Sequence, residues 1–317
     1  MSLRGSTSSS PPAGGPRERL RMAHALLIGR GVPSAPERAM QIIRECCEQK
    51  FGDALLFHAA LAARGIGRQQ DLNDAMRYVA EAAAAGDTRA RGQYAALGGK
   101  PAFDRTTWQA PIELKQHHAA PRVFTVENLL PQAACAWLIK QARKNLVRAP
   151  VQDREKGGAF SADASRTNSV AGSNPLQPDL VMQLANLRIA AAINIPVANQ
   201  EATNILNYQR GEEYKPHFDF ITPIEEKAPI FARELQTIGQ RITTVLVYLN
   251  DGYEGGETEF PLLDWRFKGK IGDALIFWNL SQTGEGERLS WHAGKPVTKG
   301  EKWLLSKWVR QRPVPLG

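Results

Sequence analysis

Residues 208–219 read YQRGEEYKPHFD, and the spacing within this stretch decides how the chain is interpreted. His217 and Asp219 stand two residues apart in a segment whose pattern predicts a β-strand, so both side chains should point to the same face. A third candidate ligand, His292, is the only histidine that follows His217. Two histidines and one carboxylate are the donor set of non-haem Fe(II) sites, which leave coordination positions open. The sequence therefore predicts a metal centre formed by His217, Asp219 and His292.

Other interpretations stay open when these histidines are taken alone. A single histidine in a strand is more often a hydrogen-bonded core or surface residue than a metal ligand. A structural zinc site normally has four ligands with cysteines among them, and Cys46, Cys47 and Cys135 lie outside the histidine motifs. The adjacent residues His117 and His118 are a weak metal site, because no further ligands accompany them. The surrounding sequence therefore has to decide between these interpretations.

From residue 121 onward the chain alternates between strand-like and helical patterns. Short apolar runs bounded by turn residues predict strands, and longer amphipathic stretches predict helices. The predicted strands cover residues 122–126, 202–208, 214–220, 242–249, 273–278, 288–293 and 303–309, and the predicted helices cover residues 131–145 and 178–192. Helices followed by many strands indicate an α+β domain built on a barrel or jelly roll.

Further motifs follow residues 208–219 in order along the chain. They are RITTVLVYLN at 241–250, GGETEFP at 255–261, GDALIFW at 272–278, HAGKPV at 292–297 and GEKW at 300–303. Together with the Y-x-x-G-x-x-Y-x-x-H-x-D pattern of residues 208–219, they resemble the motifs of the prolyl 4-hydroxylase family of Fe(II)- and 2-oxoglutarate-dependent dioxygenases. The resemblance covers residues 121–313 and implies a double-stranded β-helix (jelly roll) as the catalytic domain.

The resemblance also implies the cofactors and the residues that hold them. Fe(II) would be bound by the two histidines and the aspartate named above, with 2-oxoglutarate and O2 as co-substrates and ascorbate as a further requirement. Lys302, ten residues after His292, would bind the distal carboxylate of 2-oxoglutarate. Tyr208 is expected to hydrogen-bond near the co-substrate, and Thr244 or its neighbour Thr243 to add a hydroxyl group. No Ser/His/Asp arrangement is needed, because the metal carries the reactivity.

A prolyl residue of a peptide or protein is the substrate that the resemblance implies. Tyr214, Arg241 and Arg166 match positions that line the peptide groove in the family. Asn168 departs from the family pattern Arg-Thr-Ser at this strand. These residues are therefore candidates for substrate binding, with barrel packing as the competing explanation for Tyr214 and a surface position for Arg241.

Two variable segments should border this groove. Residues 152–165 are polar and contain a Lys-Gly-Gly sequence, which predicts a mobile loop and a candidate lid over the substrate. Residues 220–240 form an insert that is expected beside the mouth of the site. Substrate preference therefore need not follow that of collagen-type enzymes.

The first part of the chain, residues 16–97, has the composition of a helical domain. It also contains an internal echo: GRGV at 29–32, ERAM at 37–40 and GDA at 52–54 return as ARGI at 63–66, NDAM at 73–76 and GDT at 86–88. The two sets of motifs are offset by 34 to 36 residues. This period is typical of helix–turn–helix solenoid units, and the motifs resemble Sel1-like repeats, relatives of the tetratricopeptide repeat. Two units are fewer than such arrays normally need, so we expect them to pack against the second domain, with a protein partner possible.

Two segments flank the repeats. Residues 1–15 are rich in Ser, Pro and Gly and lack the apolar segment of a secretory signal, which predicts a disordered leader. Residues 98–120 contain Gly and Pro and are expected to form a linker.

Composition limits the broader class. The three cysteines indicate no disulfide framework, which favours a reducing compartment such as the cytoplasm. No apolar run reaches the roughly 20 residues that span a bilayer, so no membrane partner is expected. The net charge of +8 is spread without a dense Lys/Arg block, so nucleic acid is not expected either.

Two alternatives to a prolyl hydroxylase remain at this stage. The chain could be an oxygenase that acts on another residue, a free amino acid or a small molecule, although repeats would then serve little purpose. It could also be a repeat-based binding protein with a non-catalytic barrel, against which the complete metal motif argues.

Overall fold

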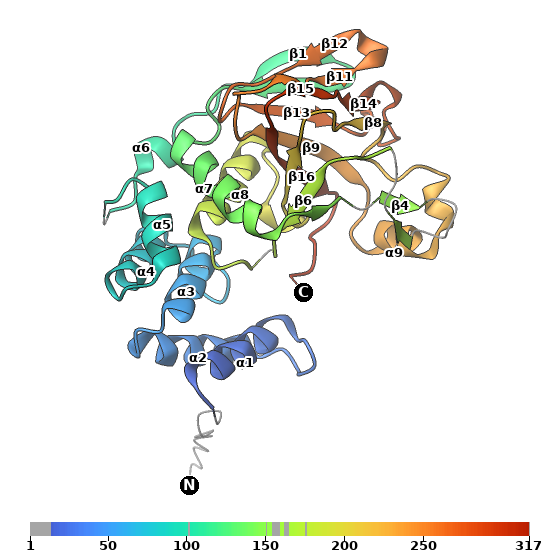
Figure 1. The fold of residues 1–317 in the computed structure, drawn as a ribbon. Helices are drawn as coiled ribbons and strands as arrows, with labels where there is room; N and C mark the ends of the chain where they lie inside the picture. Colours follow the sequence, from blue (N-terminus) through green and yellow to red (C-terminus); the bar gives the residue numbers. More distant parts are fainter. Residues whose placement is uncertain are drawn as a thin grey trace.

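The computed structural model describes residues 14–100, 102–149, 151–153, 159–161, 165–174 and 176–316. A helical N-terminal part precedes a part dominated by antiparallel strands, which confirms the predicted α+β class (Figure 1). The sheets lie at one end of the molecule in this view, and α1 and α2 lie at the other end. Within the described residues, no helix combines the length and the apolar character needed to cross a bilayer.

The N-terminal helices form two consecutive hairpins of equal helix length. They comprise α1 (Pro16–Ile28), α2 (Pro36–Glu48), α3 (Gly52–Arg64) and α4 (Leu72–Ala84), followed by α5 (Thr88–Ala96). The echo in the sequence has a structural cause: Gly29 and Gly65 end α1 and α3 in the left-handed conformation, with φ angles of 70° and 67°. Glycine adopts this conformation without steric penalty. The helical repeats are thus present, and their assignment to the Sel1-like class stays a prediction.

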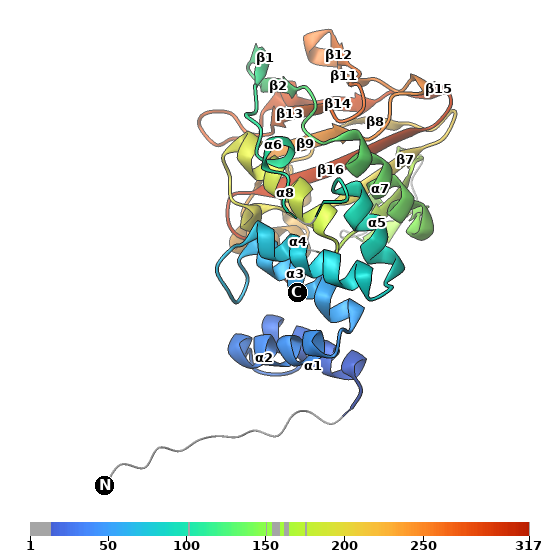
Figure 2. The same cartoon turned by 90° about the vertical axis from the view of Figure 1, so that its left-hand side faces the viewer.

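The repeats pack against the second part of the chain, as expected from their small number. α3 and α4 contact α8 (Leu180–Ile193), and α5 contacts α7 (Gln132–Ala142). Figure 2 shows α3 and α4 directly below α8, with α5 close to α7. Gln93 of α5 links the two parts: its side chain donates to the Pro178 carbonyl and accepts from the Leu180 amide.

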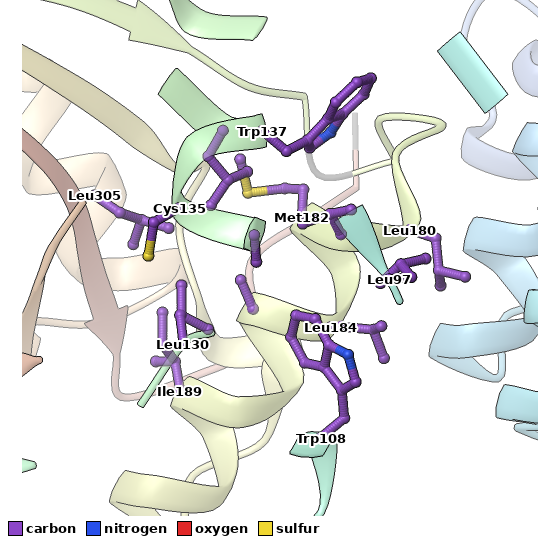
Figure 3. Packing of buried hydrophobic residues seen from close by; sticks show 14 of the residues in the cluster. Leu97, Trp108, Leu130, Cys135, Trp137, Leu180, Met182, Leu184, Ile189 and Leu305 are labelled. Atoms are coloured by element: carbon purple, nitrogen blue, oxygen red, sulfur yellow. The ribbon is translucent and has the colours of Figure 1, made fainter. Parts of the chain in front are cut away.

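One hydrophobic cluster joins these helices to the sheet (Figure 3). Leu97 comes from the end of the repeats, Trp108 from the segment that follows, Met182 from α8, and Leu305 from a central strand. All four side chains are at most 6% exposed. The repeats and the barrel therefore share one hydrophobic core. Because burying each large apolar side chain contributes roughly 1.5–3 kcal/mol, this shared core holds the two parts together.

The strands form a large and a small antiparallel sheet. The large sheet runs, in spatial order, β1 (Lys115–Ala119), β2 (Arg122–Val126), β13 (Ala274–Trp278), β9 (Arg241–Tyr248), β16 (Lys302–Arg310), β7 (Asn204–Tyr208), β6 (Ser169–Gly172) and β3 (Val147–Arg148). The small sheet runs β12 (Trp265–Phe267), β11 (Thr258–Phe260), β14 (His292–Gly294) and β8 (Tyr214–His217). Two short ribbons pair β10 (Glu254–Gly255) with β15 (Val297–Lys299) and β4 (Val151–Asp153) with β5 (Ala159–Ser161).

The large sheet is buried on both faces, and β9 shows how its residues divide. Val245 and Val247 belong to the cluster that covers α7 and α8. Leu246 and Tyr248 belong to a second cluster with Phe260 of the small sheet. Alternate residues of a strand point to opposite faces, so the second cluster lies between the two sheets. This arrangement is the double-stranded β-helix that the motifs predict.

Several predicted segments differ from the structure. The stretch 98–120 is more than a linker, because it contains α6 (Arg105–Trp108) and the edge strand β1. The predicted strand 288–293 is strand only from His292, because residues 288–290 form a 3-10 turn closed by a Ser290 hydroxyl bond to the Glu287 carbonyl. The insert 220–240 contains α9 (Pro229–Thr237), which the sequence analysis did not identify.

Candidate active site

Two paired strands of the small sheet bring the predicted histidines together. β14 runs antiparallel to β8, and in this register His292 lies directly opposite His217. Their ring centroids are 4.3 Å apart. Asp219 lies just after β8, which ends at His217, so the predicted strand 214–220 stops before the aspartate. The ligand atoms of the three residues nevertheless lie within 4.8 Å of one another.

Hydrogen bonds orient both imidazole rings. His217 donates from Nδ1 to the Lys215 carbonyl at 2.8 Å, and His292 donates from Nδ1 to the Ser290 carbonyl at 2.9 Å. A carbonyl can only accept, so each Nδ1 carries a proton, which leaves Nε2 as the atom that can bind a metal. Each Nε2 lies 3.6 Å from a carboxylate oxygen of Asp219. Fixing the ligand tautomer in this way is typical of metal-binding histidines.

The aspartate is held as an anion in a buried position. Asp219 is 4% exposed. Burial works against its ionisation, but the neighbouring His292 and His217 rings and a hydrogen bond from Thr244 hold the pKa of Asp219 below its usual range. Burial and the neighbouring His217 ring lower the pKa of His292 to about 4, which keeps its imidazole neutral near pH 7. A carboxylate and neutral imidazoles are the protonation states that bind a divalent metal.

Thr244 on β9 supports the carboxylate from behind. Its hydroxyl donates to Asp219 Oδ2 at 2.7 Å and accepts from the Asn279 amide at 3.0 Å. Thr243 instead donates to the Phe277 carbonyl and lies away from the ligands. The sequence analysis expected Thr244 beside the co-substrate, whereas the structure gives it a contact with a metal ligand. Nothing local in the sequence singled out Asn279.

Lys302 occupies the interior of the barrel, near the metal ligands. It is 1% exposed, and it lines a cavity of about 40 Å³ together with Tyr208, Asp219 and His292. Its ammonium donates to the Gly256 carbonyl at 2.6 Å and lies 5.2 Å from the centre of the Tyr208 ring. Burial lowers the pKa of Lys302 to about 7. No carboxylate among the described residues forms an ion pair with it, so its charge is available to an anion.

The paired glycines at 255–256 explain how Lys302 fits. Both have positive φ angles of 68°. A Cβ on Gly255 would lie 2.6 Å from the Pro296 carbonyl oxygen, and one on Gly256 would lie 3.3 Å from the Lys302 side chain. Only glycine meets both the backbone and the space requirement. The motif therefore shapes the wall against which the lysine packs.

Two of the three predicted substrate residues meet at the cavity. Arg166 and Tyr214 form an isolated β-bridge, and the Arg166 guanidinium lies 4.7 Å from the centre of the Tyr214 ring. Tyr214 also stacks on His217 at 3.5 Å between ring centroids. Asn168, the departure from the family pattern, accepts a 2.9 Å hydrogen bond from Arg166 Nε and so orients the guanidinium.

Arg241 does not line the cavity, and its predicted role in the substrate groove stays a prediction. Its guanidinium pairs with Glu201 at 2.8 Å, stacks over Trp308 at 3.7 Å and donates to the Asp219 carbonyl at 3.3 Å. Glu201 also pairs with Arg310. Arg241 is thus committed to an internal ion-pair network behind the metal ligand. Glu201, which anchors the network, was not identified from the sequence, because its partner lies 40 residues away.

Only one of the two variable segments is described in full. Of the candidate lid 152–165, residues 154–158 and 162–164 lie outside the described residues. The insert 220–240 is described throughout and contributes no lining residue to the cavity. Its helix α9 is held by Arg310, which donates to Glu234 at 2.5 Å and to the Gly239 carbonyl at 2.9 Å.

Comparison with known proteins supplies the family. Residues 203–310 match the 2OG-Fe(II) oxygenase superfamily. Prolyl 4-hydroxylase 1 of Arabidopsis thaliana is 32% identical over 206 residues, which cover 61% of this chain and 70% of that protein. Prolyl 4-hydroxylase 5 of the same plant is 35% identical over 210 residues, covering 59% of this chain and 68% of that protein. This chain belongs to the prolyl 4-hydroxylase family.

Solved structures were found among the same group of proteins. A viral collagen prolyl hydroxylase from Paramecium Bursaria Chlorella virus-1, in complex with 2-oxoglutarate, has a TM-score of 0.46 and 24% identity, covering 59% of this chain and 95% of that one. A Pseudomonas putida prolyl-4-hydroxylase has a TM-score of 0.40 and 18% identity, covering 61% of this chain and 95% of that one.

As a member of the prolyl 4-hydroxylase family, the chain is a 2-oxoglutarate- and Fe(II)-dependent oxygenase. The residues present fit both groups. Two imidazoles and one carboxylate place their ligand atoms within 4.8 Å of one another, and they are the donor set that non-haem Fe(II) prefers. The buried ammonium of Lys302 offers a charge-assisted bond to a carboxylate.

We expect Thr244→Val to weaken Fe(II) binding by roughly tenfold to 100-fold, the usual effect of removing a hydrogen bond to a metal ligand. The change removes the hydroxyl that donates to Asp219 and keeps the branched shape of the side chain. Anaerobic equilibrium dialysis against Fe(II) measures the affinity. Thr243→Val is the matched control, because its hydroxyl bonds the Phe277 carbonyl. Equal affinities in the two variants would contradict the role assigned to Thr244.

Proposed function

We propose that this protein hydroxylates prolyl residues of a peptide or protein substrate. The observation that carries the proposal is the buried cluster of His217, Asp219 and His292 beside the unpaired ammonium of Lys302, in a chain of the prolyl 4-hydroxylase family. Relatives named prolyl 4-hydroxylases support the substrate class.

The co-substrate site is proposed from the lining of the cavity. The ammonium of Lys302 pairs with the distal carboxylate of 2-oxoglutarate and exchanges its bond to the Gly256 carbonyl for this stronger one. Burial raises the pKa of Tyr208, so its phenol stays protonated and can donate a hydrogen bond to the co-substrate. Leu206, Leu246 and Leu304 add an apolar part to the lining, which disfavours water.

Fe(II) held by His217, Asp219 and His292, together with 2-oxoglutarate and dioxygen, supplies the oxidising power that inserts oxygen into an unactivated C–H bond. The protein's own residues supply geometry. Hydrogen bonds to the Lys215 and Ser290 carbonyls orient the two imidazole rings, and a hydrogen bond from Thr244 orients the carboxylate. Ligands that are already oriented hold the reacting groups in the geometry that the reaction needs, which lowers its entropic cost.

Substrate contact is proposed at the rim formed by Tyr214 and Arg166. Tyr214 offers an aromatic face beside the metal ligand His217, and Arg166 offers a guanidinium held in place by Asn168. A prolyl ring packs well on an aromatic face, and a guanidinium donates to peptide carbonyls. Together they suit an extended prolyl peptide.

The helical repeats are proposed to recruit the protein substrate. The compartment is proposed to be reducing, and the cytoplasm fits, because Cys46, Cys47 and Cys135 are all free thiols in the structure. Ascorbate is proposed as a reductant in the assay.

The charge state of Lys302 makes co-substrate binding depend on pH. Its pKa is about 7 in the free protein, and a bound carboxylate raises that pKa. Below pH 7 the ammonium is already present, so the affinity for 2-oxoglutarate stays constant. Above pH 7 binding must take up a proton, so we expect the affinity to fall by up to about tenfold per pH unit. Calorimetry on Mn(II)-loaded protein between pH 6 and 9, in buffers of different ionisation enthalpy, measures the affinity for 2-oxoglutarate and the number of protons taken up on binding.

Lys302→Arg is the control for this pH dependence, because a guanidinium keeps its charge across the same range. The variant should show no proton uptake above pH 7. Constant affinity and no proton uptake in the wild-type protein would contradict the lowered pKa of Lys302, and an unchanged affinity in Lys302→Ala would contradict its role in binding the carboxylate.

The activity itself is tested by succinate formation from 2-oxoglutarate with Fe(II) and ascorbate. We expect a proline-rich peptide to stimulate turnover, and His217→Ala to lower it by at least about 100-fold, because a direct ligand matters at least as much as its hydrogen-bond partners. The matched control is His118→Ala, which removes a histidine packed on Trp265 and outside the ligand cluster.

The prolyl assignment has its own control. The same peptide with alanine in place of proline should not stimulate turnover. Equal stimulation by both peptides would contradict a prolyl substrate, and unchanged turnover in His217→Ala would contradict the metal assignment.

A further inference from the structure

A second pocket lies where the first repeat helix meets the catalytic part. Its volume is about 430 Å³. Arg17, Leu20 and Arg21 line it from α1, and Phe57 lines it from α3. The segment before α8 closes it with residues that include Leu176 and Pro178. Residues at this spacing share one face of a helix, so a stripe of α1 faces the catalytic part across the pocket.

The pocket has an apolar floor. Phe57 and Leu176 are 4% and 3% exposed and belong to the hydrophobic cluster of the first repeat. Leu20 packs against the same cluster. A floor of this kind binds apolar side chains through the area they remove from water.

The rim of the pocket is positively charged. Arg17 and Arg21 are exposed, and neither has a carboxylate partner among the residues that the structure describes. Arg19, on another face of α1, is instead paired with Glu45. The one carboxylate of the lining, Asp53, is paired with Arg89. Burial and the neighbouring Arg30 lower the pKa of His24, so this lining residue adds little charge near pH 7.

This combination selects a ligand with both apolar and acidic side chains. The chain's own residues 1–13 do not fit, because they contain Arg4 and no Asp or Glu. We propose that the pocket docks an acidic, apolar segment of the protein substrate, away from the residue that is hydroxylated. The proposal rests on the proposed function and names the feature by which the repeats recognise that substrate.

The pocket and the active site belong to one continuous stretch of chain. Arg166 lines the active-site cavity, and Asn174 lines the docking pocket. The eight Cα-to-Cα steps from Arg166 to Asn174 span at most roughly 29 Å when fully extended. One substrate chain can therefore occupy both places, and docking then raises the local concentration of its prolyl segment.

Binding is tested first, without turnover. The probe is a fluorescein-labelled peptide of alternating glutamate and leucine, and fluorescence anisotropy measures its Kd. We expect Arg17→Glu/Arg21→Glu to raise the Kd by at least about tenfold, and added salt to raise the wild-type Kd. Arg44→Glu/Lys50→Glu is the matched control, because it reverses two exposed charges, one on α2 and one just after it, that do not line the pocket.

The binding result can overturn the proposal directly. A peptide of alternating lysine and leucine that binds as tightly, or equal Kd values for the two double variants, would remove the electrostatic basis of the pocket. Binding to anionic phospholipid vesicles but not to the acidic peptide would also overturn it, in favour of a membrane surface.

Turnover tests the link to the active site. The acidic segment is joined to a prolyl peptide by about 25 Gly/Ser residues, whose root-mean-square span of roughly 28 Å matches the distance limit. We expect its KM to be at least about tenfold below that of the prolyl peptide alone, with kcat unchanged. Arg17→Glu/Arg21→Glu should abolish this advantage and leave the KM of the unlinked peptide unchanged.

Failure of the two ideas can be told apart. Peptide binding without any turnover would contradict the prolyl substrate and leave the pocket in place. Turnover of the prolyl peptide with no gain from the linked acidic segment would contradict the docking proposal alone.

Discussion

The structure depends on holding one carboxylate and two imidazole rings next to one another inside the barrel. Asp219 is almost fully buried, and a buried carboxylate is costly unless opposite charges or donors surround it. Pairing of β8 with β14 sets His217 opposite His292, and Thr244 of the other sheet donates to the carboxylate. The site therefore needs both sheets in register, since a slip of one residue would turn a ligand to the other face.

The layers behind the barrel serve this requirement. The outer face of the large sheet is covered by α7 and α8, and those helices are covered in turn by the repeats. The ion-pair network of Glu201, Arg241 and Arg310 ties β9, β16 and α9 together beside the metal ligand. Removing one partner of a buried ion pair leaves the other charge uncompensated, which strongly destabilises the folded protein. Arg241 thus supports the site from within, whereas Tyr214 and Arg166 line the cavity itself.

The clustering of His217, Asp219 and His292 could be predicted from residue type and spacing, and the resemblance to a family placed Lys302 beside them. The glycines at 255–256 and Lys302 occur in short motifs that need no knowledge of distant contacts. The position of Arg241 could not be predicted, because its partner Glu201 comes from another part of the chain and either residue alone resembles a surface charge. For the same reason β1 was taken as part of a linker: its polar sequence KQHHA is typical of an exposed edge strand, which sequence alone does not separate from a loop.

The central claim is that the buried cluster would hold Fe(II) for the 2-oxoglutarate-dependent hydroxylation of a prolyl residue. It is tested most directly by turnover of a prolyl peptide under isotopically heavy dioxygen, followed by mass spectrometry of both products. The account predicts one heavy oxygen atom in the peptide and one in succinate, in equal amounts. Labelled succinate with an unlabelled, unmodified peptide would contradict the prolyl assignment, and the absence of label from both products would contradict the oxygenase itself.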